Sequence, residues 1–431
     1  MKHLRGSVKR PGEVALECEA IPPGVTSAFF VHSGWRTGST FVWSRFRETL
    51  GTISYYEYFN ESLHSLTHSG ILQRTIHHWY SKHPACAPYF AEFIPLIQPE
   101  GGVTGYDPSM AIELFIPREG PYGSITQAEF DYISSLIDYA RGVGKIAVLT
   151  ETRSLGRVAG MKAKFPGTHI LLYRSIFKQW ASFSEQAWIG NAWFFDATRA
   201  QLTASSHDPF IKKLIGVFGI DNFSTRNPKT FYLFVGLYLY LYSRAVDAMD
   251  LLIDVTKLAV DLRYRHDVET FLSAAGLQVD FSGAKDFFAF SICRIDVIEL
   301  NGWLNVFGDW IGKSASSAGY EIVERAIAEI RQEVKEHEFF AGGLRSTLEG
   351  KIAAVENAKM ELAAKVDEAG AKWEEAQQEL KALKERETQI RASLIHLGAI
   401  EMRQRKELQI LQSRSPLQRL LHRNRVRNLA V

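Results

Sequence analysis

The chain has 431 residues, of which 46% are hydrophobic and 23% charged, and its formal net charge at pH 7 is +2. This composition allows one large domain plus an appendage and gives no indication of nucleic-acid binding. Three cysteines, Cys18, Cys86 and Cys293, are odd in number and widely spaced, which fits neither a disulfide framework nor a zinc cluster and favours a reducing compartment.

The first 25 residues are basic, lack the apolar core of a signal peptide and end in the turn sequence Ile21-Pro22-Pro23-Gly24. We therefore expect a loose N-terminal extension over residues 1–25, to which no function is assigned. The longest apolar stretch, residues 231–242, is short of the roughly 20 residues that span a bilayer, so it is predicted to be a buried helix.

A strand, a loop and a helix follow one another in residues 28–46. The apolar run at residues 28–31 meets a turn rich in small and polar residues, and an apolar pattern of helical period begins at Phe41. In the turn Gly38 allows close approach, Arg36 adds a cation, and hydroxyls come from Thr37, Ser39 and Thr40. Backbone N–H groups and a helix N-terminus at such a loop bind phosphate or sulfate. The spacing is not that of a Walker A loop, because Ser39 and Thr40 stand where its Gly and Lys would be.

Strand and helix patterns then alternate along the chain, which predicts an α/β fold with a central parallel sheet and right-handed crossovers. The expected strands are residues 52–59, 145–150, 167–173 and 250–258, and the expected helices are 41–50, 124–140 (with Ser124 as N-cap and Gln127 at N3), 154–165 and 268–277. Residues 64–98 contain five histidines, His64, His68, His77, His78 and His83, without a HExxH pattern. We expect solvated or core histidines there, in a helical insertion.

Two motifs together resemble the sulfotransferases that use 3′-phosphoadenosine-5′-phosphosulfate (PAPS). Arg36, Thr37, Gly38, Ser39 and Thr40 resemble their 5′-phosphosulfate loop, closest in style to bacterial and carbohydrate sulfotransferases. Arg174 at the end of a strand and Ser182 eight residues later resemble the pair that holds the 3′-phosphate. The resemblance covers residues 26–315 and implies a P-loop-containing nucleotide hydrolase-like sulfotransferase fold, PAPS as donor, and no metal.

The resemblance also implies a general base. Glu57, on the strand after the loop, is similar to the glutamate of carbohydrate sulfotransferases, with Glu61 and His32 as alternatives. Arg36 would stabilise charge developing on the phosphate oxygens. The acceptor would be a hydroxyl or amine, on a carbohydrate or envelope glycan, and Arg153 and Arg157 could line the cofactor or an anionic acceptor. A non-catalytic coiled-coil scaffold with a sulfotransferase-like head and a P-loop kinase are the alternative functions.

The C-terminal part of the chain, residues 320–412, is predicted to be a helical arm, with a hinge at Gly342-Gly343. A heptad pattern starts at Ile352 and continues to Leu411; fourteen of its eighteen a and d positions are apolar, and Lys359 and Glu387 could set the register. A coiled coil and a homo-oligomer are expected, with a lone solvated helix as the alternative.

The basic tail at residues 413–431 could rest on an anionic membrane face. Without a membrane anchor, the resemblance favours a bacterial cytoplasmic enzyme, with peripheral contact at the inner face of the membrane as an option.

Overall fold

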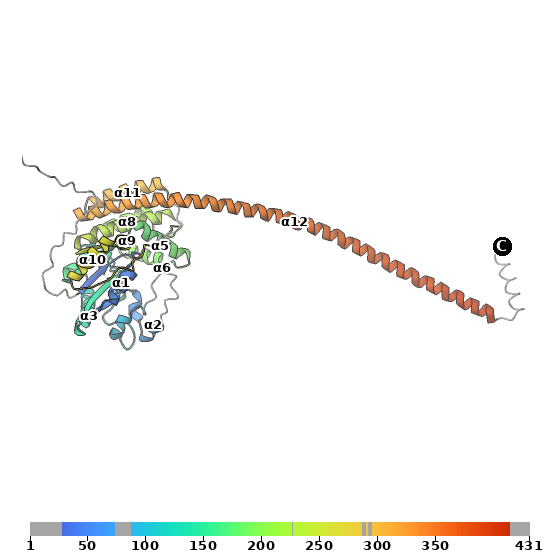
Figure 1. The fold of residues 1–431 in the computed structure, drawn as a ribbon, viewed down its shortest axis with the longest axis horizontal. Helices are drawn as coiled ribbons and strands as arrows, with labels where there is room; N and C mark the ends of the chain where they lie inside the picture. The colour runs from blue at the N-terminus through green and yellow to red at the C-terminus, as the bar shows by residue number, and fades with distance from the viewer. Residues whose placement is uncertain (1–27, 74–87, 226, 287–289, 292–294, 414–431) are drawn as a thin grey trace, which may run out of the picture. The chain divides into compact units, whose positions relative to one another are not determined.

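Five short apolar segments form one parallel sheet in the computed structural model (Figure 1), which describes residues 28–73, 88–225, 227–286, 290–291 and 295–413. The strands are β1 (Ala28–His32), β2 (Thr52–Tyr56), β3 (Ile146–Glu151), β4 (Thr168–Tyr173) and β5 (Leu251–Asp254). Their order is β2-β3-β1-β4-β5, with Phe29 of β1 level with Val148 of β3 and Thr168 of β4. The predicted α/β class with a central parallel sheet is confirmed.

Helices connect the strands and cover the sheet. They are α1 (Ser39–Glu48), α2 (His68–Gln73), α3 (Gln127–Gly142), α4 (Val158–Lys164), α5 (Ile176–Trp188), α6 (Trp193–Ala204), α7 (Pro209–Phe218), α8 (Pro228–Ala245), α9 (Val255–Val260), α10 (Leu262–Ala274), α11 (Val297–Gly312) and α12 (Ser317–Ser413). Short 3₁₀ helices are η1 (Glu61–Ser65), η3 (Ala91–Leu96), η4 (Pro108–Met110), η5 (Leu155–Arg157) and η6 (Val246–Ala248). No helix in the described ranges has both the length and the apolarity needed to cross a bilayer.

Alternate strand residues face opposite sides of the sheet, as the period of two requires. Phe29 and Val31 of β1 pack with residues of α1 and α10, whereas Phe30 packs with residues of α3 on the other side. A third apolar cluster is built around α8, which is buried from Thr230 to Ala245 and packs against α5, α7 and α11. The prediction that residues 231–242 form a buried helix is therefore confirmed.

Some predicted boundaries were wrong. The helix expected from Ser124 begins two residues later, because Thr126 is the N-cap and forms the capping box with Glu129 instead of Gln127. Glu129 receives the N–H of Thr126 at 2.8 Å, and the Thr126 hydroxyl receives the N–H of Glu129 at 3.2 Å. The strand expected within residues 250–258 ends at Asp254, whose carboxylate caps α9 by accepting the N–H of Lys257 at 3.0 Å.

The expected hinge at Gly342-Gly343 is also wrong, because α12 continues through both glycines without a break. Two glycines cost a helix roughly 1 kcal/mol each, a penalty that the helix-forming residues on either side offset. The chain divides into two units, residues 1–341 and 342–431, and the last buried residue of α12 is Ala341. The N-terminal extension, most of the basic tail, and His77, His78 and His83 lie outside the described residues.

Candidate functional site

The loop between β1 and α1 has the backbone of an anion-binding turn. Gly38 is the N-cap of α1 with a φ of 95°, and a Cβ at this position would lie 2.9 Å from Val255 Cγ1, so glycine is required for both reasons. Arg36 also has a positive φ, 64°, and the Thr37 hydroxyl donates to the carbonyl of Gly34 at 2.8 Å. The loop thus directs the N-terminus of a ten-residue helix to the carboxyl edge of the sheet.

The first hydroxyls of α1 are tied to the neighbouring strand. Ser39 Oγ and Thr40 Oγ1 lie 3.1 and 2.8 Å from the phenol oxygen of Tyr56, the last residue of β2. Burial raises the pKa of Tyr56, so its phenol stays protonated. Tyr56 therefore links the end of β2 to the loop that follows β1.

The second basic motif lies against this loop. Arg174 follows β4 and donates from Nη1 to the carbonyl of Arg36 at 3.0 Å. Arg36 donates from Nε to Ser182 Oγ on α5 at 2.9 Å. The structure therefore brings together Arg36, Arg174 and Ser182, which the sequence assigned to two separate motifs.

Electrostatics makes this corner a favourable place for an anion. Burial and then the positive charge of Arg174 lower the pKa of Arg36, and burial lowers the pKa of Arg174 against the opposing charges of Asp286 and Glu333. Within the described part of the chain no carboxylate forms an ion pair with Arg36. Two guanidinium groups that repel each other would both gain from a negative charge bound between them.

The predicted base, Glu57, lies at the end of β2, which is separated from β1 in the sheet by β3. Glu57 follows β2 and has a φ of 48°, a strained conformation for a residue with a side chain. Its carboxylate accepts from Asn60 Nδ2 at 2.6 Å and from the Thr152 hydroxyl at 3.3 Å. Arg153 Nη1 lies 3.5 Å from Glu57 Oε2, so the carboxylate is held by three partners.

Arg153 is the centre of a cluster of carboxylates. Its side chain is only 1% exposed, and its guanidinium lies 3.5 Å from both Glu57 and Glu151 and 3.0 Å from Glu61. The Arg153 guanidinium carbon also lies 5.6 Å from the ring centres of Trp35 and Trp193. Arg153 was predicted to line the cofactor or an anionic acceptor, but in this structure its charge is already paired with carboxylates.

Glu151 was missed by the sequence analysis. It ends β3, is fully buried, and accepts backbone N–H groups of Phe59, Thr152 and Arg153 at 2.6 to 3.0 Å. Burial raises its pKa to about 6, against the opposing effect of Arg153. The signal that could have identified it is an acidic residue that ends a buried strand and is followed two residues later by an arginine. Its contacts show that it positions the turn after β2.

His32 is enclosed in a hydrogen-bonded chain. His169 Nε2 lies 3.1 Å from the carbonyl of Phe165 and can only donate there, which leaves His169 Nδ1 as the acceptor for His32 Nε2 at 3.0 Å. His32 Nδ1 then accepts from the Ser154 hydroxyl at 2.9 Å. Burial and the neighbouring His169 keep the pKa of His32 well below its usual range. Both ring nitrogens are occupied, so the structure gives no support to His32 as the base.

Arg157 has a structural role. Its Nη1 lies 2.5 Å from Glu129 Oε1, its Nη2 donates to the carbonyl of Met110 at 2.6 Å, and its guanidinium covers the ring of Phe59.

Among the described residues, which include His64 and His68, no group of three or more His, Cys, Asp or Glu side chains is arranged to hold a metal. Surface hollows of about 550 and 460 Å³ lie elsewhere, the first beside Arg199 and the second beside Arg244, and neither is lined by a predicted site residue.

The observed features define an α/β protein whose parallel sheet gathers a basic corner and a carboxylate cluster at its carboxyl edge. Comparison of the chain with models of known protein families, with curated proteins and with solved structures finds no match.

Proposed function

We propose that this protein is a sulfotransferase that transfers a sulfuryl group from PAPS to a hydroxyl or amine. The observation that carries the proposal is the contact of Arg36 with Arg174 and Ser182, which come from two motifs far apart in the sequence. A doubly phosphorylated nucleotide carries its two anionic groups on opposite sides of the ribose, so it needs cationic groups from two places that face one site. Position 36, on the loop after β1, and position 174, at the end of the neighbouring strand β4, support this proposal.

The cationic and hydrogen-bonding groups at the loop fit such a nucleotide. Arg36 and the N–H groups that begin α1 would hold the 5′-phosphosulfate, and Arg174 and Ser182 would hold the 3′-phosphate. Phosphate oxygens would replace the hydrogen bond that Arg36 now donates to Ser182. The donor supplies the sulfuryl group and leaves as adenosine 3′,5′-bisphosphate; the chain's part is to orient it and to neutralise the charge that develops on its phosphate oxygens.

Glu57 is the proposed general base. Its fixed carboxylate could take the proton of an attacking hydroxyl, a contribution typically worth about 10²- to 10⁴-fold in rate. Glu61, with a side chain 37% exposed and also paired with Arg153, is the alternative. Glu57 is preferred to Glu151 because its side chain is 20% exposed, whereas the side chain of Glu151 is fully buried and holds three backbone N–H groups.

Adenosine 3′,5′-bisphosphate provides the test. Thermal unfolding followed with this nucleotide, and separately with ATP and magnesium, should show stabilisation by the first and almost none by the second. A nucleotide at a hundred times its Kd adds about 2.7 kcal/mol of stability. Stabilisation by ATP and magnesium would instead indicate a kinase, and stabilisation by neither would indicate a scaffold without nucleotide.

Variants locate the binding site. Arg36→Ala and Arg174→Ala should each abolish the stabilisation, whereas Arg199→Ala, which removes an exposed arginine on α6 paired with Asp196, should leave it unchanged. Glu57→Gln should retain the stabilisation and lose at least about 10²-fold in turnover. Normal nucleotide binding by the Arg174→Ala variant would remove the proposed 3′-phosphate site.

The acceptor is proposed to be a carbohydrate, such as an envelope glycan. Trp193, which is half-buried, lies beside the carboxylate cluster with its ring centre 5.6 Å from the Arg153 guanidinium carbon, and aromatic rings suit the apolar faces of sugars. Mass spectrometry of surface glycans from cells with and without the gene tests this proposal, which requires loss of a sulfated species in the mutant. A cytoplasmic location and membrane contact by the basic tail also stay predictions.

A further inference from the structure

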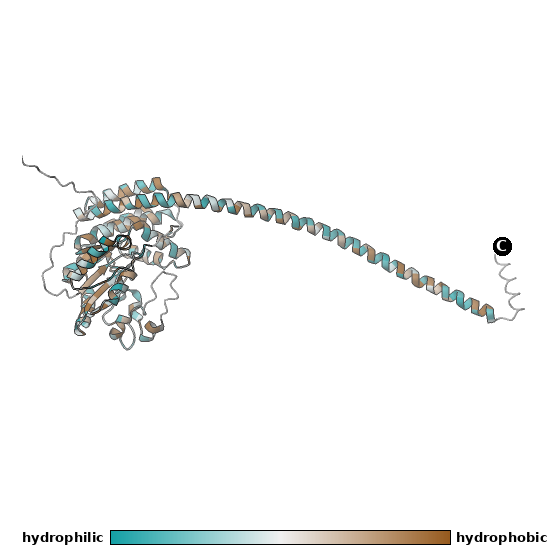
Figure 2. Ribbon diagram, in the orientation of Figure 1, coloured by the Kyte–Doolittle hydropathy of each residue, from teal (hydrophilic) through white to brown (hydrophobic). Residues whose placement is uncertain are grey.

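The part of α12 that follows Ala341 carries a stripe of exposed apolar side chains. Every described residue from 344 to 413 is at least partly exposed, and the a and d positions include Leu362, Trp373 and Leu383, each 63% exposed. Figure 2 shows hydrophobic residues recurring among hydrophilic ones along this helix. A single helix of this length with an apolar seam of period 3.5 has the pattern of a coiled-coil strand that lacks its partner.

Charges within the seam argue against a parallel pair of identical chains. In a parallel dimer each a residue packs against the same residue of the second copy, so Lys359 would face Lys359, Glu387 would face Glu387, and Glu401 would face Glu401. The flanking g and e positions would also place Arg386 beside Arg391 of the second copy, whereas Glu379 beside Lys384 and Lys351 beside Glu356 would attract. Like charges would therefore meet at several levels of one seam.

An antiparallel pair of identical chains removes all of these clashes. In that orientation the residues at heptad position a pack against the residues at position d. The whole heptad region matches end to end when Ile352 lies level with Leu411 of the second copy. Lys359 then faces Gln404, Glu387 faces the small Ala376, and Glu401 faces Leu362. The other layers are apolar on both sides: Ile352 with Leu411, Val355 with Leu408, Val366 with Leu397, Ala369 with Leu394, Trp373 with Ile390, and Leu380 with Leu383.

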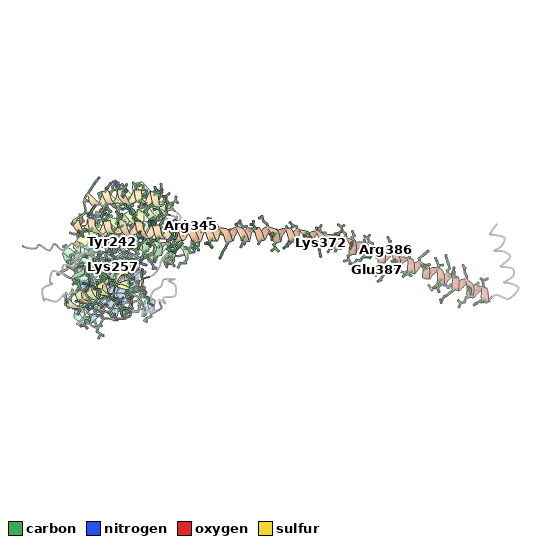
Figure 3. The ribbon with its side chains drawn as sticks, turned by 45° about the horizontal axis from the view of Figure 1, so that its top comes forward. Tyr242, Lys257, Arg345, Lys372, Arg386 and Glu387 are labelled. Atoms are coloured by element: carbon green, nitrogen blue, oxygen red, sulfur yellow. The ribbon has the colours of Figure 1, made fainter. Side chains whose placement is uncertain are left out.

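The flanking charges are complementary in the same register. In an antiparallel pair g faces g and e faces e, which sets Glu379 beside Arg386 of the second copy and Glu356 beside Arg405. Figure 3 shows the side chains of Arg386 and Glu387 projecting from the helix. Arg405, which pairs with Glu401 in its own chain at 2.8 Å, could bridge both carboxylates. By the twofold symmetry each pair occurs twice.

We infer that α12 pairs with α12 of a second copy of this chain as an antiparallel coiled coil over residues 352–411. The occupant of the seam is a second copy because this chain's own residues supply both the apolar layers and the opposite charges in one register. The inference does not depend on the proposed enzymatic function.

Disulfide crosslinking of the full-length protein tests the orientation. Two variants are made with Cys18, Cys86 and Cys293 replaced by serine, one carrying Val355→Cys and the other Leu408→Cys. After mixing and mild oxidation the antiparallel pair gives a disulfide between the two variants, whereas neither variant crosslinks alone, since identical positions lie about 80 Å apart. Crosslinking of each variant with itself would overturn the inference in favour of a parallel pair. Val366→Cys with Leu397→Cys repeats the test at a second level.

Charge reversal gives an independent measurement. Arg386→Glu should weaken dimerisation about tenfold in sedimentation equilibrium at low salt. The new glutamate would face Glu379 of the second copy at two symmetry-related places in the dimer. In a parallel dimer the same change would strengthen dimerisation by removing the clash with Arg391. The double variant Glu379→Arg with Arg386→Glu restores the opposite charges and should recover the original dissociation constant. A monomeric unmodified protein at all concentrations would overturn the inference.

Discussion

Backbone strain falls on two of the residues to which the proposal gives a chemical role. Three non-glycine residues in the described ranges have a positive φ, and Arg36 and Glu57 are two of them. Each such conformation costs on the order of 1 kcal/mol or more, and persists only where the surroundings enforce it. Here the enforcing contacts are the Arg174 bond to the Arg36 carbonyl and the bond of the Glu57 N–H to the carbonyl of Thr150 at 2.7 Å.

The buried histidine pair should make the protein sensitive to acid. Burial lowers the pKa of His169 from 6.5 to about 4. Between these values the unfolded chain binds a proton that the folded chain does not, so the free energy of unfolding should fall as the pH decreases from about 6.5 to about 4. The contribution of His169 is at most about 3 kcal/mol.

Urea denaturation at several pH values measures this effect. His169→Gln keeps a donor for the Phe165 carbonyl and an acceptor for His32 but cannot be protonated. The variant should therefore lose less stability than the unmodified protein between pH 6.5 and 4. Burial raises the pKa values of Glu151 and Glu333, which act in the opposite direction in both proteins and cancel in the comparison. Identical slopes would show that His169 does not titrate in this range.

At the scale of single elements, the glycines of α12 have opposite surroundings. A Cβ added at Gly342 or Gly343 would meet nothing within 4 Å, whereas one at Gly319 would lie 2.4 Å from the carbonyl oxygen of Ser243. Gly342→Ala with Gly343→Ala should therefore stabilise the helix by roughly 1 kcal/mol per site, and Gly319→Ala should destabilise the protein. Hydrogen exchange of the backbone around residue 342 and thermal unfolding measure the two effects. Slower exchange in the unmodified protein than in the alanine variant would contradict the prediction.

The elements that the sequence predicted well are those with a local signal. The strand, turn and helix of residues 28–48 follow from an apolar run, a glycine that needs positive φ and a helical period. The N-cap at Thr126 was misplaced because Ser124-Ile-Thr-Gln and Thr126-Gln-Ala-Glu offer two overlapping capping boxes. In the folded chain Glu129 also pairs with Arg157, a tertiary contact that favours the second box and that is absent from the local pattern.

The candidate site was predictable only in part for the same reason. Arg36, Arg174 and Ser182 could be chosen from motifs. The carboxylate cluster could not, since Arg153 meets Glu57 and Glu61 only when β2 and β3 lie side by side, across more than ninety positions of sequence. Glu151 was marked only by its place at the end of a buried strand, two residues before an arginine. Strand order, which decides these neighbours, is a property of the whole sheet.

At the scale of the whole molecule, the first turns of α12 belong to the N-terminal unit. Arg325 pairs with Asp254 at the end of β5, Glu329 accepts from the Tyr173 hydroxyl, and Glu333 accepts from the Ser175 hydroxyl. These contacts lie at the same carboxyl edge of the sheet as Arg174. Figure 1 shows this part of α12 running alongside α11. The helix thus begins as a core element and becomes an exposed arm after Ala341.

Truncation should separate these two roles of α12. A chain that ends at residue 341 keeps the buried residues Ile322, Val323, Ile327, Ile330 and Val334. It should unfold within a few degrees of the full-length protein in thermal denaturation followed by circular dichroism, but as a monomer. A chain that ends at residue 316 loses all five. Since each buried side chain of this size contributes about 1.5 to 3 kcal/mol and total stability is about 5 to 15 kcal/mol, this shorter chain should fail to fold. A cooperative transition at the same temperature in the shorter chain would show that the head does not need the helix.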